Sequence, residues 1–258
     1  MADLPVSGAE SQDQAVAEFG RHGFVVLRSV LTAEEATLFR DLAEDRYRQV
    51  ADDDPETDRL RGGVCLMRVF EAAWQFRDLM EREPVISLVE RLLGDDCHVI
   101  SQNVLRTPPP QSIVNWHIDD AQFFPFTGLD RVPVFSLSAM VLLSDVDEER
   151  FGPTQVVPGS HLLGHEPPYT DQLPPQQQPL SLLARAGDCY LVNSQTWHRG
   201  APNTSERTRY LLTTAYGRRF ISQRFYPFLN YRMPQHVLDG ASTRLRRLLG
   251  AHGKGPYG

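Results

Sequence analysis

The pattern of hydrophobic and polar positions divides the chain into a helical first part and a β-rich second part. Phe24 to Leu27 is a compact β-branched and aromatic run, which predicts a short strand. Thr32-Ala33-Glu34-Glu35 forms a capping box before an amphipathic stretch that ends near Ala51, so a helix is expected there. A second helix is expected from Pro84 to Leu93, because proline suits the first helical position and Gly94 ends the pattern.

From Cys97 onward the pattern changes to short apolar runs separated by proline and glycine. Each run is rich in Val, Ile, Leu, Thr or Tyr and is bounded by residues that favour turns, as is typical of antiparallel strands. The predicted strands are His98–Leu105, Val134–Leu143, Thr154–Val157, Asp188–Asn193 and Arg207–Tyr216. The sequence therefore predicts a mainly β fold with flanking α-helices that pack on the outside of a sandwich or barrel.

Two polar stretches predict loops. Asp52 to Gly63 is acidic and polar, and Glu166 to Pro179 has five prolines and four glutamines with no periodicity. A loop as long as the second is often a lid in a compact domain. We find no repeat or linker that would split the chain.

We therefore expect a single domain over residues 1–258. Its parts would be a helical segment at about 1–96, a β core at about 97–220, and a C-terminal helix and tail at about 221–258. The 258 residues are 41% hydrophobic, which is enough to fill a core of that size.

The basic residues are almost all arginine. Of 26 lysines and arginines, the only lysine is Lys254, in a glycine-rich tail. Schiff-base, pyridoxal phosphate and P-loop chemistry each need a lysine in structured surroundings, so these classes are excluded. A fixed positive charge in a site must come from arginine, which prefers planar bidentate partners such as carboxylates.

The remaining composition predicts a soluble, cytoplasmic protein. The net charge of −7 argues against nucleic acid as a partner. Three widely spaced cysteines fit a reducing compartment, and the N-terminus lacks the basic and apolar regions of a signal peptide. No apolar run is long enough to span a membrane, and the sequence indicates no particular oligomeric state.

The most informative stretch is Asn115-Trp116-His117-Ile118-Asp119. In an extended chain, H-x-D places both side chains on the same face, because strand side chains alternate with period two. An imidazole and a carboxylate on one face make two-thirds of a 2-His-1-carboxylate site for Fe(II). The pair alone also fits a local hydrogen bond between His117 and Asp119, so a second histidine is needed.

His198 is the candidate for that second histidine. It follows a predicted strand, and Arg209 stands eleven residues later in the next strand. A chain that leaves His198, turns and returns would bring Arg209 near the same site, where a buried arginine could bind a dicarboxylate. Arg207 shares the strand parity of Arg209 and is the alternative for this role.

Five motifs in order resemble the phytanoyl-CoA dioxygenase family of Fe(II)/2-oxoglutarate oxygenases. The motifs are H-x-D, G-x-T-x-x-x-P-G-S-H at residues 152–161, Gly187-Asp188, W-H-R-G-A-x-N-x-S at residues 197–205, and Arg209. The resemblance covers about residues 15–235. It implies a double-stranded β-helix core, which is a jelly-roll or cupin-like fold.

The resemblance also implies roles for individual residues. His117, Asp119 and His198 would bind Fe(II), and Arg209 would pair with the distal carboxylate of 2-oxoglutarate. Asn103 stands where the family often has an amide that contacts the co-substrate. Some members carry a serine two residues after the second histidine, as a further co-substrate contact, and this chain has Gly200 there.

Other residues near the motifs are candidates for the substrate pocket. Trp116 and Phe124 flank the H-x-D motif and could form pocket walls, and Gln155 could add polar specificity. His161 and His165 have H-x-x-x-H spacing, but they lack the glutamate of a zinc hydrolase and follow Pro158-Gly159, so a loop is expected there.

The resemblance implies an oxygenase that uses O2 and 2-oxoglutarate to oxidise a small molecule, with release of succinate and CO2. Hydroxylation leads, because Asp119 occupies the position that related halogenases leave free for chloride. Desaturation, epimerisation and ring rearrangement use the same kind of site and stay open. The compact size and the arginine-rich composition favour bacterial secondary metabolism. The alternative from another class is a non-catalytic, cupin-like protein that binds a small molecule.

Overall fold

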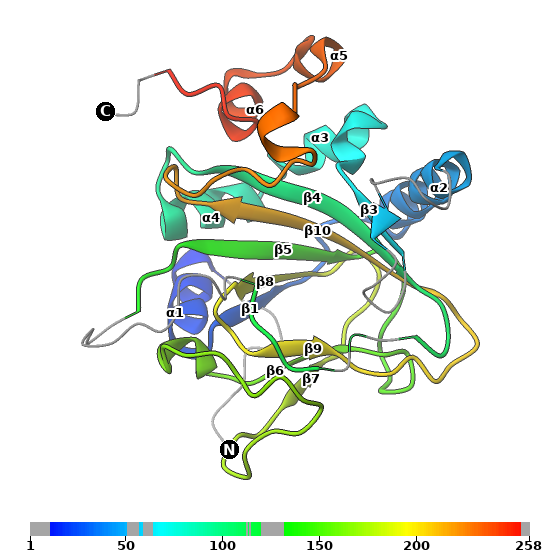
Figure 1. The fold of residues 1–258 in the computed structure, drawn as a ribbon, viewed down its shortest axis with the longest axis vertical. Coiled ribbons are helices and arrows are strands. Elements are labelled where there is room, and N and C mark those ends of the chain that lie inside the picture. The colour runs from blue at the N-terminus through cyan, green and yellow to red at the C-terminus, as the bar shows by residue number, and fades with distance from the viewer. Residues whose placement is uncertain are drawn as a thin grey trace.

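Two antiparallel sheets and a set of helices make up the fold in a computed structural model of the chain (Figure 1). The structure describes residues 11–50, 57–58, 64–111, 113, 115–119 and 132–253. The strands are β1 Phe24–Leu27, β2 Thr57–Asp58, β3 Val64–Met67, β4 His98–Thr107, β5 Ser136–Leu142, β6 Thr154–Val156, β7 Leu180–Leu182, β8 Cys189–Asn193, β9 His198–Gly200 and β10 Arg209–Gly217. The prediction of a mainly antiparallel β fold with flanking helices is confirmed.

The helices include the two that the sequence predicts. They are α1 Gln12–His22, α2 Ala33–Gln49, α3 Trp74–Leu79, α4 Val85–Leu93, α5 Gln235–Leu238 and α6 Thr243–Leu248, with 3-10 turns η1 Val69–Glu71, η3 Ser160–Leu162 and η4 Phe228–Asn230. At the start of α2, Glu35 N donates to Thr32 Oγ1 at 3.1 Å and Thr32 N donates to Glu35 Oε2 at 2.9 Å, so the capping box is present. The helix α4 begins one residue later than predicted, after Pro84.

The larger sheet has seven strands in the order β1-β8-β5-β10-β4-β3-β2, and every neighbouring pair is antiparallel. Its alternating side chains separate two cores. Leu137, Ala139 and Val141 of β5 face the helices. Met140 and Leu142 face the other way, toward the smaller sheet.

The smaller sheet has the order β7-β6-β9 and lies opposite the larger one (Figure 1). Val156 of β6 and Leu182 of β7 share a buried cluster with Phe24 of β1, Met140 of β5 and Leu211 of β10. The two sheets therefore enclose a common interior, and the functional site lies at one end of that interior.

The helices cover the outer face of the larger sheet, as the sequence predicts (Figure 1). Phe19 of α1, Phe39 of α2, Phe76 of α3 and Ile86 of α4 are nearly inaccessible and belong to one cluster with that face. The same cluster includes Leu245 of α6, so segments from both ends of the chain pack on this side.

The structure differs from the sequence-based prediction in its first hundred residues. That part supplies β1, β2 and β3 to the larger sheet, so it is not only a helical layer. Residues 57–58 fall in the stretch that predicts a loop, but their backbone pairs with β3 at the sheet edge. Polar composition does not prevent such pairing, because the hydrogen bonds of a ladder are made by the backbone.

The stretch from Glu166 to Pro179 contains no helix or strand, which confirms it as a loop. Its role as a lid stays a prediction, as does the division of the chain into one domain. None of the helices within the described ranges is long and apolar enough to cross a membrane.

Candidate functional site

His117, Asp119 and His198 converge at the edge of the smaller sheet. The segment that carries His117 pairs with β9, since each of His117 and His198 donates its backbone N–H to the other's carbonyl at 3.0 Å. Asp119 N donates to Ser194 O at 2.9 Å and continues this alignment. The two imidazole centroids are 4.3 Å apart, and His198 Nε2 lies 3.7 Å from Asp119 Oδ1.

Both histidines are oriented by the backbone two residues before them. His117 Nδ1 lies 2.9 Å from Asn115 O, and His198 Nδ1 lies 2.9 Å from Thr196 O. A carbonyl oxygen only accepts, so each neutral ring has its proton on Nδ1 and its lone pair on Nε2. Ligand atoms of the two rings and of Asp119 lie within 4.8 Å of one another. The arrangement can hold a metal ion.

The side chains between these residues point into a separate core. Trp116 and Ile118 are buried with Val157 and Trp197, on the face opposite to His117 and Asp119. The period-two alternation that the H-x-D motif predicts is therefore present. Ser160 Oγ accepts from Trp197 N at 2.8 Å, so the P-G-S-H motif holds the residue directly before His198.

Arg209 is the first residue of β10 and is 93% buried, with 7% of its surface exposed. Burial lowers the pKa of its guanidinium to about 10. Nη1 donates to the carbonyl of Gly152, while Nε is buried without a partner. No carboxylate of a described residue lies within ion-pair distance of this guanidinium. A buried cation of this kind suits an anionic ligand.

Arg207 lies in different surroundings. Its guanidinium stacks on the ring of Phe151, 3.8 Å from the centroid, and its side chain is exposed. It lines a second cavity, on the side of Ser144 and Asp145, and not the one that contains the His-Asp-His group. The structure brings Arg209, not Arg207, to the candidate site.

The site cavity has a volume of about 310 Å³ and lies between the two sheets. His117, Asp119, His198, Arg209 and Asn103 all line it, so the structure brings these five predicted site residues together. Asn103 pairs across the sheet with Thr213 of β10, which also faces the cavity.

Other residues of the cavity wall are not among the sequence-based candidates. They include Ser101 and Leu105 of β4, Ser138 of β5, Thr213 of β10, and Arg224 and Phe228 beyond β10. Strand parity with Asn103 is a signal that finds Ser101 and Leu105. No pattern in the sequence indicates Arg224 or Phe228. Ser138 Oγ lies 3.4 Å from Asp119 Oδ2 and so contacts the proposed metal ligand.

Trp116 and Gln155 contact a residue of the cavity wall and are not themselves among its described lining residues. Both hold Arg199: its guanidinium lies 4.8 Å from the Trp116 ring centroid, and its Nε donates to Gln155 Oε1 at 2.8 Å. Arg199 lines the cavity next to His198. Phe124, the other pocket candidate, lies outside the described residues.

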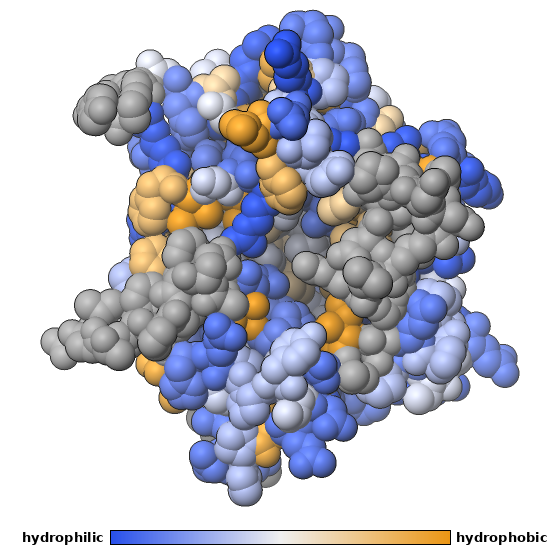
Figure 2. Space-filling model, in the orientation of Figure 1, coloured by the Kyte–Doolittle hydropathy of each residue, from blue (hydrophilic) through white to orange (hydrophobic). Residues whose placement is uncertain are grey.

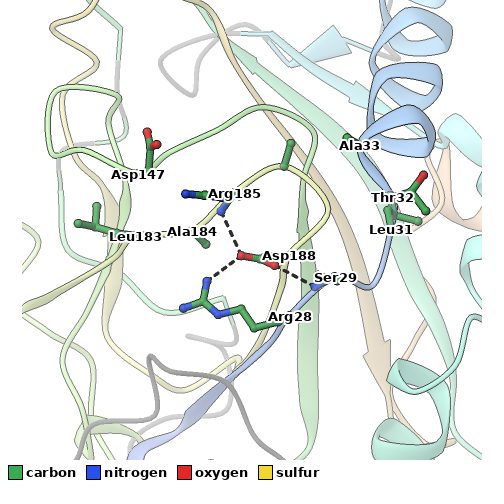
Figure 3. A pocket seen from close by; sticks show the side chains of 11 residues that line it. Arg28, Ser29, Leu31, Thr32, Ala33, Asp147, Leu183, Ala184, Arg185 and Asp188 are labelled. Atoms are coloured by element: carbon green, nitrogen blue, oxygen red, sulfur yellow. Dashed lines mark hydrogen bonds and ion pairs between the residues drawn. The ribbon is translucent and has the colours of Figure 1, made fainter.

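The Gly187-Asp188 motif is structural. Figure 3 shows Asp188 accepting hydrogen bonds from Arg28, Ser29 and Arg185. The Asp188 carboxylate oxygens lie 2.7 Å from Arg28 Nη1 and 2.9 Å from Ser29 N. The motif therefore joins the β7–β8 turn to the chain that links β1 to α2.

His161 and His165 do not form a metal site with each other. His161 Nε2 lies 3.2 Å from Gly20 O and is buried, whereas His165 is exposed beside Trp197. Within the described part of the chain, the His117-Asp119-His198 group is the one set of three such side chains close enough to hold a metal ion.

Comparison with known proteins gives relatives that match different shares of the chain. "Dioxygenase trt7" from Aspergillus terreus is 29% identical over 121 residues, which is 46% of this chain and 38% of that protein. The chain's match thus spans well under two-thirds of that dioxygenase. An uncharacterized protein of Mycobacterium bovis is 24% identical over 229 residues, covering 86% of this chain and 81% of that protein.

A solved structure with a related fold is the epimerase SnoN from nogalamycin biosynthesis, described as non-heme and α-ketoglutarate-dependent. It is 25% identical, covers 80% of this chain and 83% of that chain, and has a TM-score of 0.62. A second SnoN structure contains Fe3+, α-ketoglutarate and nogalamycin RO. The carbocyclase SnoK has a TM-score of 0.65 at 22% identity, with 81% of this chain and 85% of that chain covered, and so supports the fold alone.

The family profile of phytanoyl-CoA dioxygenase (PhyH) matches residues 19–211, which is most of the chain and includes every motif of the site. The resemblance that the motifs indicate is thereby confirmed. Iron and 2-oxoglutarate are the cofactor and co-substrate in a structural neighbour, and the His-Asp-His group offers matching ligands. The chain belongs to the phytanoyl-CoA dioxygenase family.

Proposed function

We propose that this protein is an Fe(II)- and 2-oxoglutarate-dependent dioxygenase that oxidises a small molecule. One observation carries the proposal: the ligand atoms of two histidines and a carboxylate lie within 4.8 Å of one another, in a cavity of about 310 Å³ that a buried arginine also lines. The first set suits Fe(II), and the arginine suits the distal carboxylate of 2-oxoglutarate. The non-catalytic, cupin-like alternative would need neither feature.

The residues present fit the group that the family implies. His117 and His198 would bind Fe(II) through Nε2, and Asp119 would bind it through a carboxylate oxygen. Each Nδ1–H is already bonded to a backbone carbonyl, which fixes the ring and raises its basicity. Arg209 would bind the distal carboxylate, and Asn103 lines the same cavity from β4, four residues along the strand from the residue that pairs with Arg209.

The protein's own contribution is to bind, orient and exclude water. Met140, Leu105 and Leu211 give the cavity apolar walls, which favour the ionic contacts of Arg209 over contacts with water. Ser138 restrains the Asp119 carboxylate from the larger sheet. When bound, iron and 2-oxoglutarate supply the oxidising power, with O2 as second co-substrate and succinate and CO2 as co-products.

Hydroxylation is the reaction that we propose. We also propose that the core is a double-stranded β-helix and that the enzyme acts in bacterial secondary metabolism. The small-molecule class is supported by the similarity to SnoN, an epimerase from nogalamycin biosynthesis. SnoN is an epimerase and SnoK a carbocyclase, so the same kind of site serves reactions other than hydroxylation. Desaturation, epimerisation and ring rearrangement are therefore the alternatives for this chain.

The test is oxygen-dependent succinate formation from 2-oxoglutarate by the iron-loaded protein. We expect slow succinate formation with no added substrate, faster formation with a turned-over compound, and none for His117→Ala. Mass spectrometry of the oxidised compound then separates a gain of one oxygen from a loss of two hydrogens. If neither iron nor 2-oxoglutarate binding changes in His117→Ala, the dioxygenase proposal is wrong and the binding-protein alternative stands.

A further inference from the structure

A short apolar segment stands at the mouth of the site cavity. The segment Pro227–Tyr231 is fixed at both ends: buried Phe225 packs against Phe70 with ring centroids 5.1 Å apart, and Tyr231 donates its hydroxyl to Glu71 Oε1 at 2.9 Å. Between these anchors Phe228 is 63% exposed and Leu229 is 98% exposed. The segment holds two large apolar side chains in solvent.

The backbone of this segment is in an uncommon conformation. Phe228 has φ of 58°, a left-handed value that is costly for a residue with a bulky side chain. Its N–H donates to Phe225 O at 2.6 Å, which maintains the turn. Strain of this kind persists where the surrounding structure enforces it, and it is concentrated at ligand-binding segments.

One of the two exposed side chains, that of Phe228, reaches the cavity. Phe228 lines the same cavity as His117, Asp119 and His198, and Arg224 lies beside it on the wall. Figure 2 shows hydrophobic residues at the upper edge of the central hollow, next to hydrophilic ones. Two exposed apolar residues at a site entrance are better placed for a ligand than for a large protein interface.

The size of the cavity points the same way. Its volume of about 310 Å³ lies at the lower end of the range for pockets that enclose a ligand. The metal ion and 2-oxoglutarate of the proposed function would take part of this volume. Only the reacting part of a larger substrate then fits inside, so the rest of that substrate must lie at the mouth.

We propose that Phe228 and Leu229 form a substrate platform that binds a planar apolar ring system outside the cavity. The ring system stacks on the Phe228 side chain and covers Leu229, while the atom to be oxidised reaches toward the His-Asp-His group. The two residues thereby determine specificity for substrates that are larger than the cavity. This proposal rests on the proposed function, because it assigns the ring system to the substrate of that site.

The first test uses the neutral fluorescent dye N-phenyl-1-naphthylamine as a probe. The Phe228→Ser, Leu229→Ser double variant should bind the dye at least about ten-fold more weakly, since two apolar contact surfaces are lost. The control is Phe220→Ser, which removes another exposed phenylalanine, packed edge-on against Phe135 and not among the cavity residues. The control should stay within about two-fold of the original protein. Equal affinities in all three proteins would overturn the platform.

A second measurement locates the bound dye. With Mn(II) and 2-oxoglutarate added, the protons of the dye should relax faster in the presence of the original protein and lose this enhancement with the double variant. Dye that binds without enhancement, although Mn(II) is bound, lies elsewhere and refutes the platform. Failure to bind Mn(II) would instead refute the iron site, and the fluorescence comparison would still be read separately.

Sedimentation of the same proteins tests the competing occupant, a second copy of this chain. We expect Leu229→Ser to leave the oligomeric state unchanged. If the original protein is a dimer and Leu229→Ser converts it to a monomer, the exposed pair belongs to a protein interface and the substrate platform is wrong.

Discussion

At the scale of single residues, the site combines side chains fixed by neutral backbone groups with one buried charge that pairs with no carboxylate of the described residues. His117 and His198 are each held by a carbonyl two residues earlier. Arg209, by contrast, has a buried Nε with no acceptor. The free energy of an anion bound there would come largely from compensating this charge.

Arg209→Gln should weaken 2-oxoglutarate binding by at least about 100-fold, because removing one partner of a buried charge pair costs about 3–5 kcal/mol. Iron binding should change little, since Arg209 is not among the metal ligands that we propose. Titration calorimetry with each ligand in turn measures both effects.

The matched control for Arg209 is Arg207→Gln, two positions earlier and stacked on Phe151 outside the site cavity. Its 2-oxoglutarate affinity should stay within about two-fold of the original protein. A larger loss of affinity in Arg207→Gln than in Arg209→Gln would show that Arg207, and not Arg209, contacts the carboxylate.

His198→Ala should weaken Fe(II) binding by more than about 100-fold. Removing a group that only hydrogen-bonds to a metal ligand lowers metal affinity by about 10–100-fold, and removing the ligand itself should lower it further. Metal titration under anaerobic conditions measures it. His165→Ala is the control: His165 is exposed, and its Nδ1 lies 2.9 Å from Glu166 O. Equal losses in both variants would show that the effect is not specific to His198 and would contradict its assignment as a metal ligand.

The sequence indicates these residues to different degrees. The H-x-D motif correctly predicts that His117 and Asp119 share one face, because the alternation of side chains along a strand is a local property. The bridge between His117 and His198 joins residues 81 positions apart and depends on the fold of both sheets. Phe228 and Arg224 reach the cavity through a non-repetitive segment that has no period to detect.

At the scale of secondary-structure elements, tight turns in close contact with neighbouring segments position the strands that carry the site. Gly187 lies in the turn before β8, with φ of 92°, and its carbonyl accepts from Leu31 N at 3.0 Å. A Cβ atom at this position would lie 2.2 Å from Leu31 O. Only glycine allows the turn and the β1–α2 connection to approach so closely.

Gly187→Ala should lower the free energy of unfolding by more than about 3 kcal/mol, because left-handed backbone costs about 1–2 kcal/mol and the clash adds to it. Gly240→Ala is the matched control, with φ of 70° and nothing within 4 Å of the added Cβ. It should cost only about 1–2 kcal/mol. Urea unfolding measures the loss in both variants. Equal losses would show that the close approach to Leu31 adds nothing to the cost of the left-handed backbone.

The elements themselves follow from the sequence where the signal is local. The capping box of α2 and the five strands of the β-rich part are present close to their predicted bounds. The short strand β2 is not predictable from its own residues, because only pairing with β3 makes it a strand. The strand β9 likewise depends on partners on both sides, β6 and the His117 segment.

At the scale of the whole molecule, the arrangement of layers explains why metal ligands and arginine meet. The smaller sheet supplies His198, and the larger sheet supplies Arg209, Asn103 and Ser138. The helices bury the other face of the larger sheet, so the side chains on its inner face are free to form a site. The sequence pattern predicts helices and strands, but it does not predict which face of the larger sheet the helices leave uncovered.

We expect the histidines outside the site to make the fold sensitive to acid. Burial lowers the pKa of His22, His98, His161 and His252. His98 Nδ1 lies 3.0 Å from His252 Nε2, and His98 Nε2 lies 2.7 Å from Ile221 O, so this pair joins β4 to the C-terminal segment. Protonation of both rings would place two positive charges in contact.

The metal-free protein should therefore lose stability as the pH falls below about 6.5, the ordinary pKa of histidine. The unfolded chain then binds protons that the folded chain does not, and each such histidine lowers the unfolding free energy by up to about 1.4 kcal/mol per pH unit. Thermal unfolding at about pH 7.5 and about pH 5.5 measures the slope. His98→Asn should reduce it, and His165→Asn, at an exposed position, should not. A midpoint that is the same at both pH values would show that these rings are protonated in the folded state as readily as in the unfolded one.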